Sequence, residues 1–317
     1  MSTEREVPMN EEVQEFTTLD LDSMQASEGS DIADQRHEWA NRFQAVLPIE
    51  IQLAPGAINR AQDMRADGYP IIFPYAHSRM RDPIDAIGAS IRMGRGFDNP
   101  RFSGPVAYHQ WQKPYIRTFA RLAEMDATPI VTASTIEKGK NIENVPISDQ
   151  IKYAAREGLG HIPGVSAFER PEPRRIPLRK GLNESLTSDT KTLKQMGIVF
   201  TAPQGERLPE LGESSGPVIG ALVRRAERDG VDMDKVGVWP MGIMIMDGKD
   251  PERHDDNFGL IHSVGKKAVI RLESPITINE LRTMTEKARR AGDPDATLDS
   301  STFKLLRRVL PHSYYEE

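Results

Sequence analysis

The 317-residue chain contains no cysteine. This absence excludes disulfide bonds, thiolate metal sites, a cysteine nucleophile and redox chemistry at sulfur, and it fits a reducing compartment. Long apolar runs are also missing, because the longest, residues 236–246, is well short of the roughly 20 residues that cross a bilayer. The amino end has neither a basic segment nor an apolar core, so no secretory signal is expected. These absences predict a cytoplasmic protein.

Negative charge is concentrated at the amino end of the chain. The formal net charge is −6, and residues 1–36 alone contribute −8, with ten acidic and two basic side chains, which leaves +2 for the remainder. Acidic segments with few large apolar residues are typically solvated. We expect a disordered acidic tail over residues 1–36, with a partner-binding or regulatory arm as the alternative, and a single domain over residues 37–317.

Helix and strand patterns alternate along that domain, and 38% of the chain is hydrophobic, enough for a sizeable core. Apolar runs of strand length occur at 69–75, 129–133, 165–168, 197–202, 236–245 and 268–272. Helical patterns occur at 37–46, 83–93, 115–125, 181–196, 217–229 and 278–291. This alternation predicts an α/β fold with a mostly parallel central sheet flanked by helices.

Residues suited to chemistry follow the predicted strands, and in a parallel sheet ligands bind beyond the carboxyl ends of the strands. The candidates are His77, Asp82, Arg170, Gly205, Glu206 and Arg207. His77 ends one strand and Asp82, as the expected N-cap, starts the next helix, so a turn between them can bring carboxylate to imidazole. Together these residues predict a general base beside an anion-binding site.

Four short blocks occur in order between residues 70 and 245. They are HSRMRD from His77 to Asp82, GVSAFER ending at Arg170, VFTAPQGER ending at Arg207, and VWPMG ending at Gly242. In this order they resemble the blocks of the glycerolipid acyltransferase superfamily, which includes the glycerol-3-phosphate and 1-acylglycerol-3-phosphate acyltransferases. The first block has the H-x4-D spacing of that family, and the resemblance implies a glycerol-3-phosphate acyltransferase-like fold.

The resemblance also implies a reaction. A fatty acyl group would pass from acyl-CoA or acyl carrier protein to the hydroxyl of a glycerol phosphate or lysophospholipid acceptor, in phospholipid biosynthesis. His77 would act as general base, and Asp82 would orient it and stabilise the imidazolium. No cofactor and no metal ion is implied, and the expected partners are the two substrates, with no nucleic acid.

Substrate binding falls to the later blocks. Arg170 and Arg207 would hold the acceptor phosphate, and Gly205, followed by Glu206, would let backbone N–H groups approach it. Two further basic residues would add to this site or meet the phosphates of the donor, with a solvated loop face as the alternative; they are Arg174 and Arg175.

The third block departs from the family pattern, with Gln204 where the family usually has Glu and Glu206 where Thr is common. The acceptor therefore stays open, and two alternatives remain: an acyltransferase acting on another lyso-lipid head group, and a non-catalytic acyl- or lipid-binding homologue. A metal-dependent hydrolase, suggested by acidic residues and a histidine at 247–256, is a more distant alternative.

The carboxyl-terminal residues 300–310 form an amphipathic helical pattern. Apolar side chains gather on one side of the helical wheel and Lys304, Arg307 and Arg308 on the other. Such a helix either docks on its own domain, the more common case, or lies on anionic lipid. The second case would give peripheral contact with the inner membrane face.

Overall fold

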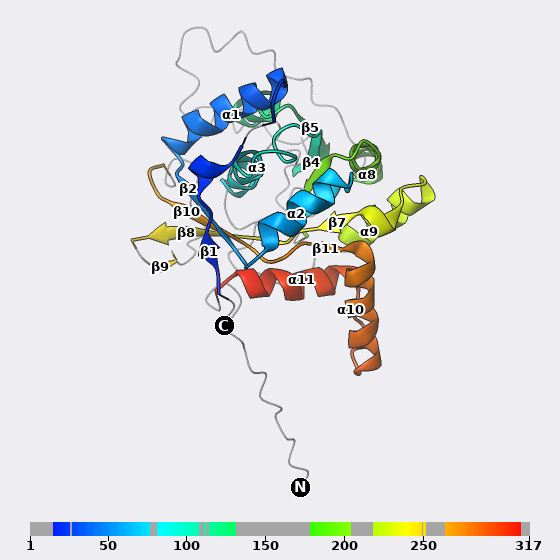
Figure 1. Cartoon of the computed structure of the whole chain (residues 1–317). Helices are drawn as coiled ribbons and strands as arrows, with labels where there is room; N and C mark the ends of the chain where they lie inside the picture. Colours follow the sequence, from blue (N-terminus) through cyan, green and yellow to red (C-terminus); the bar gives the residue numbers. More distant parts are fainter. Residues whose placement is uncertain are drawn as a thin grey trace, which may run out of the picture.

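Helices and strands alternate through the chain as the sequence predicts, and the fold is α/β (Figure 1). The computed structural model describes residues 15–25, 27–76, 81–107, 111, 114–130, 178–203, 218–248, 250–251 and 264–311. Its α-helices are α1 (Asp31–Gln44), α2 (Ala57–Ala66), α3 (Asp82–Arg92), α5 (Pro114–Leu122), α8 (Leu178–Lys194), α9 (Val218–Arg228), α10 (Ile278–Arg290) and α11 (Leu298–Val309). Its strands are β1 (Thr17–Thr18), β2 (Ile49–Leu53), β3 (Ile71–Pro74), β4 (Phe102–Ala107), β5 (Met125–Ile130), β6 (Ile198–Thr201), β7 (Gly237–Val238), β8 (Met241–Asp247), β9 (Asp250–Pro251), β10 (Ala268–Leu272) and β11 (Ile276–Thr277).

The larger sheet is mostly parallel, as expected. Its order is β11-β7-β3-β6-β4-β5, and all neighbours run parallel except β11 and β7. β3 and β6 pair in register from Ile71 opposite Ile198 to Pro74 opposite Thr201. The carboxyl ends of these two strands therefore lie side by side. The strand predicted at 165–168 lies outside the described residues.

A second sheet, with the order β1-β2-β10-β8-β9, was not predicted. The run at 236–245, expected as one strand, is divided between the two sheets as β7 and β8. The division falls at Trp239 and Pro240, and a proline cannot donate to a strand ladder. The chain first follows β3, with Trp239 N donating to Ile72 O at 2.9 Å, and from Met241 onward it pairs with β10. One apolar segment thus joins both sheets.

Helix α3 lies between the two sheets, where it contacts β2, β8 and β10 of one and β6 of the other (Figure 1). It is buried almost all round, from Asp82 and Ile84 in its first turn to Ile91 near its end. At Gly88 an added Cβ would lie 3.9 Å from Ile49 Cδ1, an ordinary van der Waals distance, so this side of the helix packs directly against β2. α3 is the next element after β3 in the chain, and its first turn is buried inside the protein.

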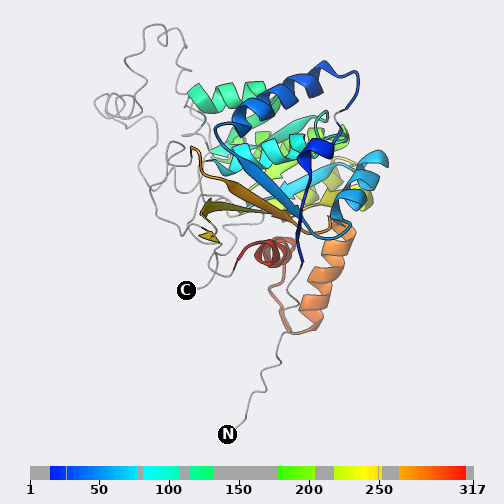
Figure 2. The ribbon, with the colours of Figure 1, turned by 60° about the vertical axis from the view of Figure 1, so that its left-hand side comes forward.

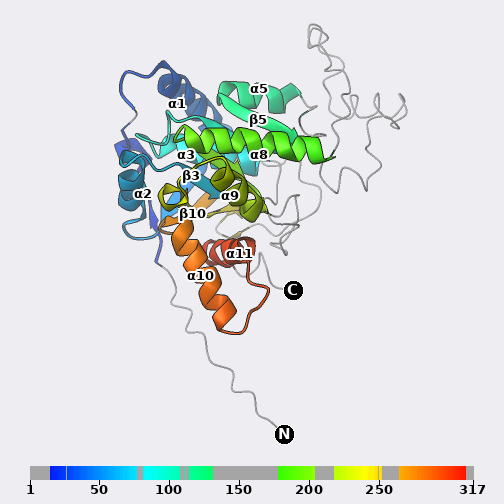
Figure 3. The same ribbon diagram turned by 90° about the vertical axis from the view of Figure 1, so that its right-hand side faces the viewer.

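The opposite face of the larger sheet is covered by α8, α9 and α10 (Figure 3). Their apolar side chains pack on Ile72, Val199 and Val238 of the sheet. Asp299, buried in the first turn of α11, accepts hydrogen bonds from the backbone N–H groups of Ile219 (2.7 Å) and Gly220 (3.0 Å) at the amino end of α9. The charge of this carboxylate also suits the positive end of the α9 dipole.

Helix α11 confirms the amphipathic pattern at 300–310 and begins two residues earlier. Its apolar face packs against β8 and β10, where Phe303 and Leu306 join Met244 and Val269 in a buried cluster (Figure 2). The face considered for lipid contact is therefore covered by the protein's own sheet. Within the described ranges, no helix has the length and apolar character needed to cross a bilayer.

The amino-terminal segment differs from the expected disordered tail over 1–36. β1 pairs antiparallel with β2, and α1 begins at Asp31 with Ser30 Oγ accepting from Ala33 N. The acidic Asp31 and Asp34 lie in the first turn of this helix, where the dipole favours negative charge. The charge count was misleading here because helix starts also collect acidic residues; residues 1–14 lie outside the described part.

Candidate active site

Of the predicted site residues, Asp82 lies in the described part of the chain. The catalytic partner and the substrate-binding residues lie outside it, namely His77, Arg170, Arg174, Arg175, Gly205, Glu206 and Arg207. The described strands β3 and β6 nevertheless show where the chain leaves the sheet before His77 and before Gly205. Helix α3, which carries Asp82, is described along its whole length.

Three of the four sequence blocks belong to neighbouring parallel strands. β3 leads to the first block, β6 carries the start of the third, and β7 carries the start of the fourth. Ile72 of β3 pairs with Val199 of β6 on one side and with Val238 of β7 on the other. The carboxyl ends of β3 and β6, which lead into the first and third blocks, therefore lie at the same edge of the sheet, as the sequence predicts for parallel strands. The second block, ending at Arg170, lies outside the described residues.

Asp82 occupies the first turn of α3 and is fully buried. The sequence predicts it as the N-cap, but the N-cap position is Arg81, which makes no side-chain capping hydrogen bond. Arg81 has helical backbone angles, and its carbonyl accepts from Asp85 N at 2.9 Å, so the helix starts one residue earlier than expected. Capping by Asp82 therefore does not account for a buried carboxylate at this point, while the helix dipole favours its negative charge there.

Tyr75 follows the last residue of β3 and is buried close to this turn. Its backbone N–H donates to Thr201 O at 3.0 Å, and it forms a parallel bridge with Met241, so it is fixed between β6 and β8. Burial raises the pKa of the Tyr75 phenol above its ordinary value, and the negative charge of Asp82 raises it further. The phenol therefore keeps its proton at neutral pH and remains a hydrogen-bond donor beside Asp82.

Arg81 and Asp85, at the start of the same helix, form a fully buried ion pair. Arg81 Nε donates to Asp85 Oδ2 at 2.6 Å and Arg81 Nη2 to Asp85 Oδ1 at 2.9 Å, a bidentate arrangement. Arg81 Nη1 also donates to Lys266 O at 2.8 Å. Burial raises the pKa of Asp85 to about 7, and the charge of Asp82 adds to this although Arg81 opposes it.

The described groups at this edge suit a carboxylate that orients a base, because Asp82 is buried, sits at a positive helix end and has a phenol nearby. No three His, Asp or Glu side chains within the described ranges gather closely enough to hold a metal ion. Of the cluster that suggested a metal site, Asp247 and Asp250 are backbone register partners of β8 and β9, whereas residues 252–256 lie outside the described part.

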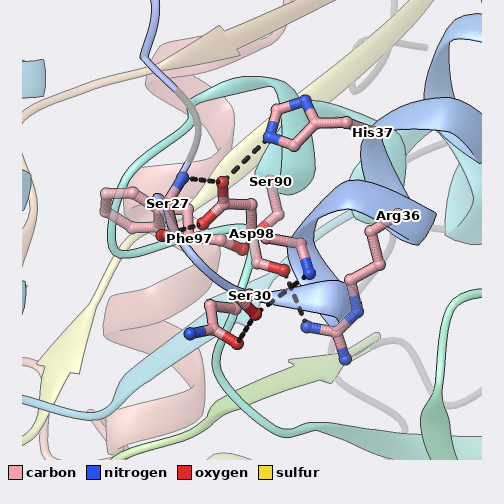
Figure 4. Close-up of polar contacts among 9 residues, drawn as sticks. Ser27, Ser30, Arg36, His37, Ser90, Phe97 and Asp98 are labelled. Atoms are coloured by element: carbon pink, nitrogen blue, oxygen red, sulfur yellow. Dashed lines mark hydrogen bonds and ion pairs between the residues drawn. The ribbon is translucent and has the colours of Figure 1, made fainter.

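A second polar cluster lies at the start of α1, around the buried Asp98 (Figure 4). Ser27 Oγ donates to Asp98 Oδ1 at 2.5 Å and Ser27 N to Asp98 Oδ2 at 2.8 Å, while His37 Nε2 lies 2.9 Å from Asp98 Oδ2. Serine, histidine and aspartate meet here, but the serine hydroxyl is bonded to the carboxylate and not to the imidazole. The order of contacts is therefore not that of a catalytic triad, and the cluster fastens the amino-terminal segment to the domain.

Stability below neutral pH should depend on this cluster. Burial acts to raise the pKa of Asp98, but hydrogen bonds from His37 and Ser27 outweigh it and hold the pKa below its ordinary value. A lowered pKa means that the stabilisation is present above the unfolded value of about 3.9 and is lost as pH falls through the folded value. Urea denaturation between pH 7 and pH 3 should show a steeper loss of unfolding free energy at the acid end for wild type than for Asp98→Asn. Parallel curves for the two proteins would contradict this.

Three residues around Asp82 were not among the predicted site residues. Arg81 and Asp85 carry a signal that could have identified them, since opposite charges four residues apart face each other on a helix. Tyr75 carries no comparable signal, because a tyrosine at the end of an apolar run is ordinary.

No protein-family model matches this chain, and no curated protein matches it either. The residues, the strand order and the surroundings of Asp82 are therefore the features that bear on function.

Proposed function

We propose that the protein is an acyltransferase that moves a fatty acyl group from acyl-CoA or acyl carrier protein to the hydroxyl of a glycerol phosphate or lysophospholipid acceptor. The observation that carries the proposal is the fully buried Asp82 in the first turn of α3, the next element after β3. The strands on either side, β6 and β7, carry the starts of the third and fourth blocks. Ordered blocks at one sheet edge are far more specific than a single H-x4-D match.

The proposed chemistry needs no covalent intermediate on the protein. His77 takes the proton of the acceptor hydroxyl while the hydroxyl oxygen attacks the thioester carbonyl. Asp82 holds the imidazole and stabilises the imidazolium that forms. The carbon–sulfur bond then breaks, and the imidazolium returns the proton to the leaving thiolate. The absence of cysteine agrees with such a direct transfer, in which base catalysis supplies about 10²–10⁴ in rate and positioning supplies the rest.

In this proposal Arg170 and Arg207 bind the acceptor phosphate through charge-assisted hydrogen bonds. Gly205 allows backbone N–H groups to approach the same phosphate, with Glu206 beside it. The third block begins in β6, which pairs with β3, the strand that leads to His77. This pairing supports a phosphate site close enough to the base for one acceptor molecule to reach both. Arg174 and Arg175 would strengthen this site or meet the phosphates of the acyl donor.

A non-catalytic acyl- or lipid-binding protein of the same fold is the second candidate. The replacement of the family's usual Glu by Gln204 favours it, because the third block is then altered within the residues that would contact the acceptor. Such a protein would bind an acyl donor without releasing thiol. An acyltransferase for a different lyso-lipid head group would instead release thiol with another acceptor.

The test combines a substrate panel with one base variant. Purified protein is given acyl-CoA or acyl carrier protein together with glycerol-3-phosphate, lysophosphatidate or other lyso-lipids, and thiol release is followed. We expect release with at least one pair, a loss of about 10²–10⁴ in His77→Ala, and a wild-type rate in His37→Ala, whose histidine belongs to the Asp98 cluster. Donor binding without thiol release for every acceptor would favour the binding protein, and an unchanged rate in His77→Ala would remove the base assignment.

A further inference from the structure

The first turn of α3 is held from outside the helix. Its N-cap residue, Arg81, makes no side-chain capping hydrogen bond, and Pro83 in this turn has no N–H to donate. The guanidinium of Arg81 instead binds both carboxylate oxygens of Asp85 one turn further on. It also donates to Lys266 O at 2.8 Å and to Pro48 O at 3.4 Å. The turn that carries Asp82 is thus tied to the segments that lead into β2 and β10.

Stability alone is a poor reason for this arrangement. A buried ion pair is costly to desolvate, and apolar residues of similar volume often replace such a pair without loss of stability. Most other buried side chains of α3 are apolar, among them Ile84 and Ile87. What a bidentate guanidinium supplies, and two apolar side chains do not, is a fixed direction for the backbone on either side of Asp82.

We propose that Arg81 is a positioning residue for the acyl transfer reaction: clamped by Asp85 and by two backbone carbonyls, it fixes the first turn of α3 so that the Asp82 carboxylate keeps one orientation toward the base. This inference rests on the proposed function for its catalytic consequence. Arg81 itself need not touch substrate, and its effect passes through the turn. A pre-organised supporting contact of this kind acts on the turnover step rather than on substrate binding.

The experiment compares two helical ion pairs between residues four apart in the sequence: the buried pair Arg81–Asp85 and the partly exposed pair Arg225–Asp229. The double variant Arg81→Met, Asp85→Leu removes the clamp without leaving an uncompensated buried charge. The matched control is Arg225→Met, Asp229→Leu on α9, where Arg225 Nε lies 2.7 Å from Asp229 Oδ2. We expect the first variant to lose about 10–100-fold in kcat with KM nearly unchanged, and the control to keep wild-type kcat. Arg81→Lys keeps one charged hydrogen bond to Asp85 but not the bidentate contact, so its kcat should lie between those of the two double variants.

Hydrogen exchange gives a readout that does not need activity. The amide of residue 85 makes the first hydrogen bond of α3, and its exchange should speed up about tenfold or more in Arg81→Met, Asp85→Leu, while that of Ile91 stays constant. If wild type transfers no acyl group, the proposed function fails, and the exchange at residue 85 still decides whether Arg81 fixes the turn. Unchanged exchange overturns the inference, as does an active double variant with wild-type kcat.

Discussion

Replacing Asp82 by asparagine is expected to lower kcat for acyl transfer by about 10²–10⁴-fold while the protein stays folded. The amide is nearly the same size as the carboxylate, so packing in the first turn of α3 is retained. It carries no negative charge, however, and so cannot stabilise the imidazolium that forms as the acceptor hydroxyl loses its proton. Initial rates at saturating donor and acceptor, with the unfolding midpoint recorded for each protein, measure the effect.

Asp85→Asn is the matched control for this experiment. It makes the same chemical change three residues later, in the same buried helix, and the amide oxygen can still accept one hydrogen bond from Arg81. The change also leaves the buried charge of Arg81 without its partner, so the unfolding midpoint of this variant is recorded as well. We expect a loss in kcat below about tenfold, since Asp85 acts through the turn and not on the base. Equal losses in the two variants would mean that the charge of Asp82 has no special role, and the proposed mechanism would then fail.

Replacing Arg36 by methionine is expected to reduce the free energy of unfolding by about 3–5 kcal/mol. The guanidinium is buried and donates to the carbonyls of Ala123 (3.0 Å), Asp98 (2.9 Å) and Pro100 (2.7 Å), and it stacks 3.9 Å from the ring centre of Phe102. Methionine would fill the space but leave these carbonyl groups buried without a donor. Burial lowers the pKa of Arg36 to about 10, so the donor stays charged at neutral pH. Urea denaturation at pH 7 provides the measurement.

Arg42→Met on the same helix is the control for Arg36. Arg42 makes an exposed ion pair with Glu38 at 2.5 Å, and such pairs contribute about 0.5 kcal/mol or less. If the two variants lost similar, small amounts, the helix start at 31–36 would not be part of the stable domain. A tail over residues 1–36 would then be the better description of this segment.

The regular part of the fold could be predicted where apolar patterns are clear. β10 coincides with the predicted run 268–272, and α10 and α9 lie within a residue of the predicted bounds. β4 was missed because Gly104 and Pro105 look like a turn. Gly104 is needed there for packing, since an added Cβ would lie 2.5 Å from Phe200 O.

Part of the site could also be predicted, since the sequence places Asp82 at a helix start after a strand, and the structure agrees to within one residue. The sequence does not predict that the first turn of this helix is fully buried. Burial of α3 depends on the second sheet, and the second sheet depends on one apolar segment changing partners at Pro240. Local periodicity shows neither the packing of α3 on the second sheet nor the change of strand partners at Pro240, because both depend on residues far apart in the sequence. It also does not show which backbone carbonyl groups accept hydrogen bonds from Arg36 and Arg81.

The carboxylate of Asp299 gives the end of the chain an unexpected importance. A protein shortened before this residue would lose not a lipid anchor but the anion that neutralises the amino end of α9. Helix α9 comes directly after residues 204–217, the segment that includes Gly205 and Arg207. We expect truncation to weaken the amino end of α9, so loss of activity in a shortened protein would not by itself show that α11 binds lipid.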